Sequence, residues 1–459
     1  MVYSSLLFIY GFFPVSLLLF YITPKKHREL TLLLLSALFC CGISAYFLIF
    51  IFLFTLINYA MCRLIEMAHK SERLSAVPLS CGIIIDLMSI FVFRTDYFSW
   101  LQDIIKVPER FFPIGISFYA LSVTGTLIDV YKKRIKAERS FLKFALYIMF
   151  FPRLFMGPLL RYETFRKVMD NRREGLSEIG AGMTVFIKGL AKKVIIADNL
   201  YMLYSASRSV GVTDMSALTA WLGVIAFLLC LYFELSAFAD MGTGIGYCFG
   251  CKFPRSFYYP IMSTRIKFFT SRWQPQIIHW IRRYVTKPFT SACPKKWLRE
   301  IIFVSGWVLC GLWYSISLNG IIFGLLIGIA LVLEKYLVRN NLMNFTGIFY
   351  TQMAVILCTV FFSGRSLSYS FRYLFALIGG NGSFTDAQSF YLLKYYLVLI
   401  LISVYAATDL FRNMVRRLGK TKARNLIPAV SPLMMLAALA VCTALISYSG
   451  SSDRLLIWL

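Results

Sequence analysis

The chain has 459 residues, of which 59% are hydrophobic and 15% charged, and its mean hydropathy is +0.69. Soluble domains contain about 45–50% apolar and about 25% charged residues, so this composition excludes an ordinary soluble protein and indicates a lipid bilayer. The formal net charge of +26 does not indicate nucleic acid, because cytoplasmic loops of membrane proteins collect Lys and Arg beside anionic lipid. We therefore expect membrane lipids, and no nucleic acid, as partners.

Basic clusters alternate with apolar runs along the chain. The first apolar run, Ser5–Ile22, has neither a basic leader nor a small-residue cleavage pattern, so we expect a retained helix. The next run, Leu30–Met61, begins and ends near basic clusters and is expected to be a hairpin of short helices. We place six clusters on the cytoplasmic side: Lys25–Arg28, Arg63–Arg73, Lys132–Arg139, Arg161–Arg173, Lys252–Arg299 and Arg412–Arg424.

Two further runs, Leu79–Phe93 and Ile114–Val130, are expected to cross out and back, which leaves Arg94–Arg110 outside. The run Phe141–Leu160 is apolar but has basic clusters on both sides. It also contains Pro152, Arg153, Gly157 and Pro158. A straight span would put one cluster on the wrong side, so we expect a re-entrant or broken element that is buried in protein.

The remaining apolar runs continue the alternation: Met183–Ala197, Ala217–Phe249, Ile301–Trp313, Ile321–Leu337, Ala354–Phe362, Tyr391–Ala407 and Leu433–Tyr448. Together they predict an all-α polytopic membrane protein with a single domain over residues 1–459. We expect about ten to twelve membrane-embedded helices, re-entrant elements included. The basic bias and the retained first helix favour a multi-pass protein of a bacterial cytoplasmic (inner) membrane.

The cysteines and histidines of the chain do not form a recognisable metal-binding or catalytic pattern. Most of the eleven cysteines, such as Cys40, Cys41 and Cys442, lie in apolar runs and are expected to be small buried hydrophobes. The three histidines, His27, His69 and His279, have no His or Cys at helical ligand spacing. We therefore predict no metal site and no bound cofactor, and no Ser-His-Asp or Cys-His arrangement can be built.

The segment Lys252–Arg299 is unusual because it holds eleven Lys or Arg residues and no Asp or Glu. Apolar residues recur in it at helical spacing, at Ile266, Phe269, Trp273, Ile277, Trp280 and Tyr284. This pattern predicts an amphipathic helix at the cytoplasmic interface. It could anchor the protein to lipid, or it could attract an anionic donor such as an acyl-CoA or an acidic acyl carrier protein.

Three charged residues lie inside apolar segments, where charge is costly and often functional. Glu234 and Asp240 are six residues apart, and helical geometry puts them on opposing faces. They are either a buried acid pair or partners of nearby Lys and Arg. Arg153 would need a carboxylate or several carbonyls as partners.

A series of short motifs follows one order along the chain: Pro113–Tyr119 with Ile128–Tyr131, Phe151-Pro152 with Gly157-Pro158 and Arg161, Gly189–Val194 with Ala197-Asp198, Leu231–Phe233 with Ser236 and Asp240-Met241, Arg272-Trp273, Gly311–Trp313 and Phe361-Phe362. These motifs and their order resemble the membrane-bound O-acyltransferase family. The branch is the one that acylates cell-envelope and secreted polysaccharides, as in alginate O-acetylation and teichoic-acid D-alanyl transfer. The resemblance covers about residues 1 to 370 and leaves 371–459 as C-terminal helices.

The resemblance implies a ring of tilted helices around a central tunnel. An acyl donor, acyl-CoA or an acyl carrier protein, would enter from the cytoplasm, and an acceptor hydroxyl from the far side. A histidine at the waist of the tunnel would deprotonate this hydroxyl. The residues that we expect along the tunnel or at the substrate are Arg153, Glu234, Asp240, Arg272, Trp273 and Trp313.

The chain departs from the family pattern where the chemistry is expected. Tyr314 stands in place of the catalytic histidine, Gln274 replaces the histidine of the Arg-Trp-His motif, and Arg153 replaces a third. A phenol with a pKa near 10 is a poor base near neutrality, whereas an imidazole is a good one. General-base catalysis raises a reaction rate about 10²–10⁴-fold, so a site without it could still transfer acyl groups at a reduced rate.

Three functions follow from this pattern. The first is a catalytically degenerate subunit, scaffold or conduit of an envelope or exopolysaccharide acylation system. Its partner would be an active homologue, an extracytoplasmic transferase or a polymer synthase. The second is a working O-acyltransferase with a rearranged site around Tyr314. The third is a transporter or lipid-handling protein that reuses the tunnel.

Overall fold

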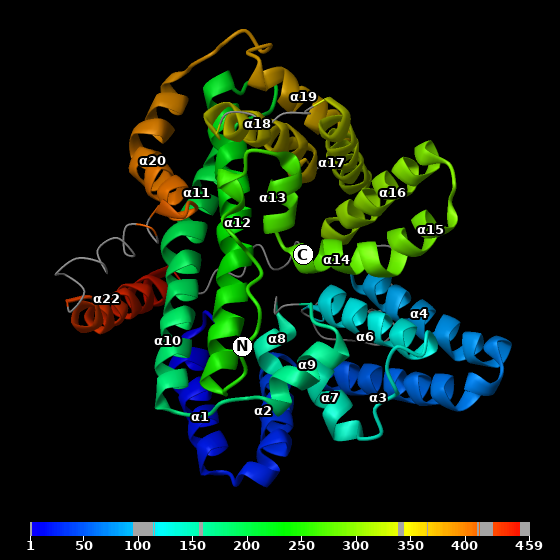
Figure 1. Ribbon diagram of the computed structural model, residues 1–459. Coiled ribbons are helices and arrows are strands. Elements are labelled where there is room, and N and C mark those ends of the chain that lie inside the picture. The colour runs from blue at the N-terminus through cyan, green and yellow to red at the C-terminus, as the bar shows by residue number, and fades with distance from the viewer. Residues whose placement is uncertain are drawn as a thin grey trace. The chain divides into compact units, whose positions relative to one another are not determined.

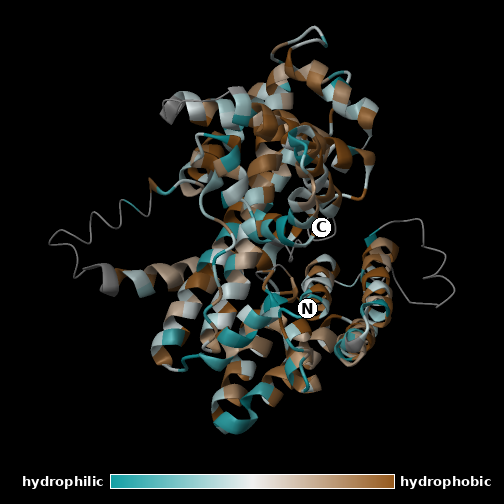
Figure 2. Ribbon diagram, turned by 45° about the vertical axis from the view of Figure 1, so that its right-hand side comes forward, coloured by the Kyte–Doolittle hydropathy of each residue, from teal (hydrophilic) through white to brown (hydrophobic). Residues whose placement is uncertain are grey.

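The computed structural model describes residues 2–94, 113, 115–155, 159–337, 344–364, 366–410, 413 and 426–449. These residues form helices almost throughout (Figure 1), and the β-type pairing among them is one antiparallel bridge between Phe257 and Trp273. In Figure 2, brown hydrophobic residues occur along many of the helices, interspersed with paler and teal ones. The all-α polytopic prediction is confirmed. Seven described helices are long and apolar enough to span a membrane, and the count of ten to twelve embedded elements stays a prediction.

The chain divides into two compact units. Unit 1 contains Met1–Gly189 and Phe238–Arg255, and unit 2 contains Leu190–Ala237 and Ser256–Leu459. Helices α10 (Leu176–Ala191) and α12 (Ala217–Cys248) each contribute residues to both units. Dense contact within two units is compatible with one membrane domain, so the single-domain assignment stays a prediction.

Unit 1 contains both short and long helices, and many of them are joined by short connections. Two helices occupy the predicted hairpin region Leu30–Met61, because extended backbone at Ser44 separates α2 from α3, but α3 is a long helix of 23 residues and the hairpin arrangement stays a prediction. Helix α3 packs against α4, α6 and α7. The elements are η1 (Leu7–Phe12), α1 (Phe13–Ile22), η2 (Lys25–His27), α2 (Arg28–Ile43), α3 (Ala45–Met67), η3 (Ala68–Lys70), α4 (Glu72–Arg94), α6 (Ile116–Tyr131), α7 (Phe141–Met149), α8 (Phe151–Leu154) and α9 (Tyr162–Asp170).

The broken element predicted at Phe141–Leu160 is confirmed within the described residues. Helix α7 ends at Met149, Phe150 leaves the helical region, and α8 begins with Pro152 in its first turn. Proline is tolerated there because the amide that it lacks would have no intrahelical partner. Gly157 and Pro158 lie outside the described residues, as do the predicted external stretch after Arg94 and the basic residues of Arg412–Arg424.

Unit 2 contains the longer run of helices: η5 (Lys192–Ala197), α11 (Asp198–Ser207), the first part of α12, η6 (Pro260–Met262), α13 (Ile266–Arg272), α14 (Pro275–Ile281), η7 (Arg282–Thr286), α15 (Lys287–Ala292), α16 (Lys296–Tyr314), α17 (Leu318–Leu337), α18 (Asn344–Ser363), α19 (Leu367–Leu377), α20 (Ala387–Ala406) and α22 (Leu426–Ser449). Helices α16 and α17 form a tight hairpin (Figure 1). Their backbones touch at glycines: a Cβ on Gly311 would overlap the carbonyl oxygen of Gly320, and one on Gly324 that of Trp307. Small residues allow this close approach in membranes.

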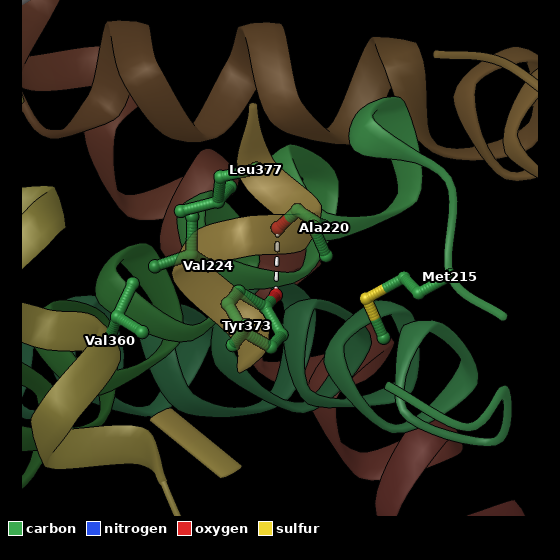
Figure 3. Packing of buried hydrophobic residues seen from close by; sticks show 7 residues of the cluster. Met215, Ala220, Val224, Val360, Tyr373 and Leu377 are labelled. Carbon is green, nitrogen blue, oxygen red and sulfur yellow. Dashed lines mark hydrogen bonds between the residues drawn. The ribbon is translucent and has the colours of Figure 1, made fainter. Parts of the chain in front are cut away.

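A second core in unit 2 joins α12, α18 and α19. Figure 3 shows Tyr373 of α19 among Val224, Val360 and Leu377, with its hydroxyl aimed at α12. This hydroxyl donates to the carbonyl oxygen of Ala220 at 2.7 Å. A buried phenol needs such a partner, and this one fixes α19 on α12.

The single amphipathic helix predicted across Lys252–Arg299 is wrong. Helix α13 ends at Arg272 and α14 begins at Pro275, and Gln274 between them is left-handed (φ 40°, ψ 58°). A residue before proline is disfavoured in the α region, so Pro275 breaks the helix there. Most of the predicted apolar stripe is buried in protein rather than facing lipid: Ile266, Phe269, Trp273, Ile277 and Tyr284.

The glycine contacts give a stability prediction. Gly324→Leu should lower the thermal midpoint of the detergent-solubilised protein by an amount equivalent to about 1–3 kcal/mol, because the side chain must separate α16 from α17. The measurement is thermal unfolding followed by tryptophan fluorescence. Gly180→Leu is the matched control, because a Cβ on Gly180 in α10 meets no atom within 4 Å. Equal midpoints for both variants would contradict the helix contact.

Candidate functional site

Three polar side chains meet where α13, α14 and α16 come together in unit 2. The indole Nε1–H of Trp273 donates to the Tyr314 hydroxyl at 2.9 Å. That hydroxyl donates in turn to Oε1 of Gln274, also at 2.9 Å. All three side chains are buried. The single proton of the Tyr314 phenol is therefore held by an amide oxygen.

This chain of hydrogen bonds forms part of the wall of a pocket of about 60 Å³. Beyond the trio, the wall is almost entirely apolar: Leu228, Leu231, Phe269, Thr270, Ile277, Ile278, Trp307, Cys310, Gly311, Phe323, Ile327, Val355, Thr359 and Phe362. The rings of Phe323 and Phe362 lie at 6.4 Å and 5.9 Å from that of Tyr314. The pocket has the volume of a few water molecules and lies well below the about 300–1,000 Å³ of typical ligand sites.

The described lining of the pocket carries few ionisable groups. Its described lining includes no histidine, carboxylate, lysine or arginine, and its ionisable groups are the Tyr314 phenol and the Cys310 thiol. A neutral phenol that already donates its proton to an amide is not a base. Hydrogen bonding and apolar packing are the interactions that this wall can offer.

The local fold explains why these residues meet. The break at Gln274–Pro275 turns both Trp273 and Gln274 into the pocket, whereas a continuous helix would separate them by about 100°. Glu334 of α17 holds the start of α13, because its carboxylate accepts from the amides of Ile266 at 2.6 Å and Lys267 at 3.3 Å. Tyr314 is the last residue of α16, where the hairpin turns into α17.

Glu234 pairs with a lysine rather than with Asp240. In unit 2, the Nζ of Lys193 lies 3.0 Å from Glu234 and 2.7 Å from Asp198. The side chains of Lys193 and Glu234 are 3% and 1% exposed, so this cation and carboxylate neutralise each other away from water. Helix α12 continues without a break to Cys248, so Asp240 stays on another face, as the helical spacing predicts.

Arg153 finds carbonyl and aromatic partners rather than a carboxylate. Within unit 1, its Nη1 donates to the Tyr147 carbonyl oxygen at 3.0 Å. Its guanidinium lies 5.0 Å from the ring centroids of both Tyr147 and Phe165. Such cation–π contacts are the favoured environment of a buried arginine. The expectation of a carbonyl partner is therefore met by one carbonyl and two rings.

The other candidate residues do not line the pocket of Tyr314. Trp313 is buried, and its ring packs against Tyr314 at 4.8 Å. Arg272 lines a separate pocket of unit 2, beside Tyr258 and Tyr259. His279 is exposed on α14 and does not line this pocket.

The sequence analysis did not single out two features that the structure shows: the buried carboxylate Asp86 and the cysteine pair Cys248 and Cys251. Asp86 lies fully buried in the α4 span, and its carboxylate accepts from Asn58 at 2.9 Å and Thr124 at 2.7 Å. A charge in the middle of the run Leu79–Phe93 was the signal that could have found it. Cys248 and Cys251 have Cys-x-x-Cys spacing, but both are free thiols, and each contacts other groups, Ile179 and Met169 respectively.

The lysine cluster gives a prediction. Lys193→Met removes the ammonium that faces Glu234 and Asp198, so we expect a loss of about 3–5 kcal/mol, seen as a lower thermal midpoint in detergent. The matched control is Lys167→Met, because Lys167 pairs with Glu163 in the open, with side chains 71% and 47% exposed. That pair should be worth about 0–1 kcal/mol. Similar midpoints for the two variants would contradict the assigned role of Lys193.

Comparison with known proteins supports the resemblance. Residues 109–371 match the model of the MBOAT, membrane-bound O-acyltransferase family. A probable alginate O-acetylase of Azotobacter vinelandii is 28% identical over 447 residues, which is 93% of this chain and 89% of the relative. That of Pseudomonas aeruginosa is 30% identical over 387 residues, 81% and 74% of the two chains. A peptidoglycan O-acetyltransferase of Helicobacter pylori is 26% identical over 430 residues, which cover 83% of this chain and 80% of the relative. This multi-pass membrane protein belongs to the membrane-bound O-acyltransferase family.

Proposed function

We propose that this chain is a non-catalytic member of its family that works as a subunit, scaffold or conduit in acylating an envelope or secreted polysaccharide. One observation carries the proposal. At the position of the family histidine, the Tyr314 proton is held by Gln274 in an apolar pocket whose described lining contains no base. Without a group to take the acceptor's proton, general-base catalysis is lost.

The names of the relatives support the proposed setting in polymer acylation. They are called alginate O-acetylases, a peptidoglycan O-acetyltransferase and teichoic acid D-alanyltransferases, which all act on cell-envelope or secreted polymers. The proposed setting is a bacterial cytoplasmic membrane. The proposed partners are an active homologue, an extracytoplasmic transferase or a polymer synthase that performs the transfer. If a donor reaches this chain, the eleven basic residues of Lys252–Arg299 suit acyl-CoA or an acyl carrier protein.

A genetic experiment separates a scaffold from an enzyme. In the source organism, deletion of the gene should abolish the acyl esters of the affected polymer, whereas chromosomal Tyr314→Phe should leave them unchanged. The phenylalanine keeps the ring but removes the hydroxyl. Ester content is measured by release of the acyl group with alkali, and protein level by immunoblot. Tyr373→Phe is the matched control for loss of a buried tyrosine hydroxyl outside the pocket. Loss of the esters in Tyr314→Phe at normal protein level would contradict the proposal.

A biochemical experiment complements it. The purified protein should not esterify a polysaccharide or alcohol acceptor with acyl-CoA or acylated carrier protein above background. The double variant Tyr314→His, Gln274→His restores two imidazoles to the pocket wall. Acyl transfer gained by this variant would show that the donor and acceptor routes are intact and that only the missing base prevents acyl transfer. Transfer by the unchanged protein, within about 10²-fold of an active relative, would refute the non-catalytic assignment.

A further inference from the structure

A second pocket of unit 2, distinct from that of Tyr314, combines opposite charges and aromatic rings. It has a volume of about 520 Å³, within the range of small-molecule sites. The lining residues are Tyr258, Tyr259, Met262, Thr264, Arg272, Ile348 and Asp409. We call it the Arg272 pocket. It shares no lining residue with the pocket of Tyr314.

The two charges of the Arg272 pocket do not neutralise each other. Among the described residues, no ion pair joins Arg272 to Asp409, and neither side chain makes a hydrogen bond, although both line the same space. Each is partly exposed, so each presents its charge to the pocket at little desolvation cost. A guanidinium and a separated carboxylate complement a ligand that carries one anionic and one cationic group.

The walls of the Arg272 pocket are fixed by hydrogen bonds. The amide of Tyr258 donates to the carbonyl oxygen of Arg272 at 3.1 Å, beside the bridge between Phe257 and Trp273. On the other side, the side-chain amide of Gln352 in α18 donates to the carbonyl oxygen of Ile261 at 2.8 Å. The loop that carries both tyrosines is thus tied to α13 and to α18.

Backbone strain also points to this loop. Tyr259 has φ 54° and ψ 62°, a left-handed conformation that is rare for a residue with a bulky side chain. Strained residues of this kind persist where the surroundings hold them, and they concentrate at binding sites. Here the strain places the Tyr259 side chain on the wall of the Arg272 pocket.

The position of the pocket along the helices gives its depth in the membrane. Ile348 lies in the second turn of α18, and Asp409 lies three residues beyond the end of α20. Both helices are apolar enough to span a bilayer, so their ends lie at the level of the lipid headgroups. Tyr258 is 46% exposed, and tyrosine is enriched at this level of membranes.

We propose that the Arg272 pocket binds the headgroup of a zwitterionic phospholipid, in which a phosphate is joined to an ammonium group. Arg272 holds the phosphate through charge-assisted hydrogen bonds. Asp409 faces the ammonium, and the rings of Tyr258 and Tyr259 attract it through their π faces. Phosphatidylethanolamine has this chemistry, whereas phosphatidylglycerol has the phosphate without the cation.

The test is native mass spectrometry of the purified full-length protein with added phosphatidylethanolamine or phosphatidylglycerol. We expect about tenfold tighter binding of phosphatidylethanolamine. Arg272→Gln should weaken binding of both lipids by about tenfold or more, and Arg272→Lys should restore part of it. Asp409→Asn should remove the preference and leave phosphatidylglycerol binding unchanged. Tyr258→Phe should bind as the unchanged protein does, and Tyr258→Ala should bind several-fold more weakly.

Two control variants carry matched charge changes outside the pocket. They are Arg282→Gln and Asp214→Asn, both at exposed positions of unit 2. A loss in these controls as large as in Arg272→Gln would overturn the site, because it would assign binding to general surface charge. Equal affinity of the unchanged protein for the two lipids, or a preference that survives Asp409→Asn, would overturn it as well.

A soluble competitor distinguishes a lipid from a free phosphate ester. O-phosphoethanolamine carries the same headgroup charges without acyl chains. It should displace phosphatidylethanolamine at concentrations far above those of the lipid, because the chains add apolar contact that the soluble ester lacks. Binding of the soluble ester as tight as that of the lipid would overturn the lipid assignment and point to a water-soluble ligand.

Discussion

The absence of water inside a bilayer constrains every polar group of this protein. Each amide, hydroxyl or charge that leaves the aqueous phase must find a partner within the chain, at a cost of several kcal/mol if it does not. Several buried polar groups find such partners in the structure. Glu334 caps the start of α13, Asn58 and Thr124 hold Asp86, and Lys193 neutralises Glu234. These contacts determine where helices begin, break and pack.

The same constraint acts on the polar side chains of the Tyr314 pocket. In an apolar wall, a buried hydroxyl or amide needs a hydrogen-bond partner. The Tyr314 hydroxyl donates to Oε1 of Gln274 and accepts from the indole N–H of Trp273. These three side chains therefore form one coupled arrangement. A buried polar network of this kind favours a unique packing when every member is satisfied.

The two pockets of unit 2 differ in chemistry although they share the segment around Arg272 and Trp273. The pocket lined by Trp273 is small and mainly apolar, whereas the pocket lined by Arg272 is large and has side chains of opposite charge. Two residues in the left-handed region serve different pockets: Gln274 lines the pocket of Tyr314, and Tyr259 lines the Arg272 pocket. Because consecutive side chains of a non-helical segment point in different directions, one short stretch can serve both spaces.

Much of the architecture could be predicted from the sequence, because it depends on local patterns. Apolar runs long enough for a bilayer predicted the helices, and Pro152 with its flanking charges predicted the break near Phe150. The order of short motifs indicated the family, and the residues Tyr314 and Gln274 singled out from those motifs meet in one pocket. Helical periodicity misled at Ile266–Tyr284, where Pro275 had more influence on the backbone than the apolar stripe. Propensity and pattern are averaged over a window, whereas one proline acts at a single residue.

The sequence by itself determined that the chain is a membrane protein, that it is helical, that it belongs to an acyltransferase family and that Tyr and Gln stand at positions 314 and 274. These properties follow from composition, from hydrophobic runs and from residue identity at motif positions. Only the tertiary structure decided which distant groups meet: Gln274 with Tyr314, Lys193 with Glu234, Arg272 with Asp409 across one pocket. Such encounters depend on how helices pack and where they break, and hydrophobic patterns along a chain specify which face is buried but not which partner it meets.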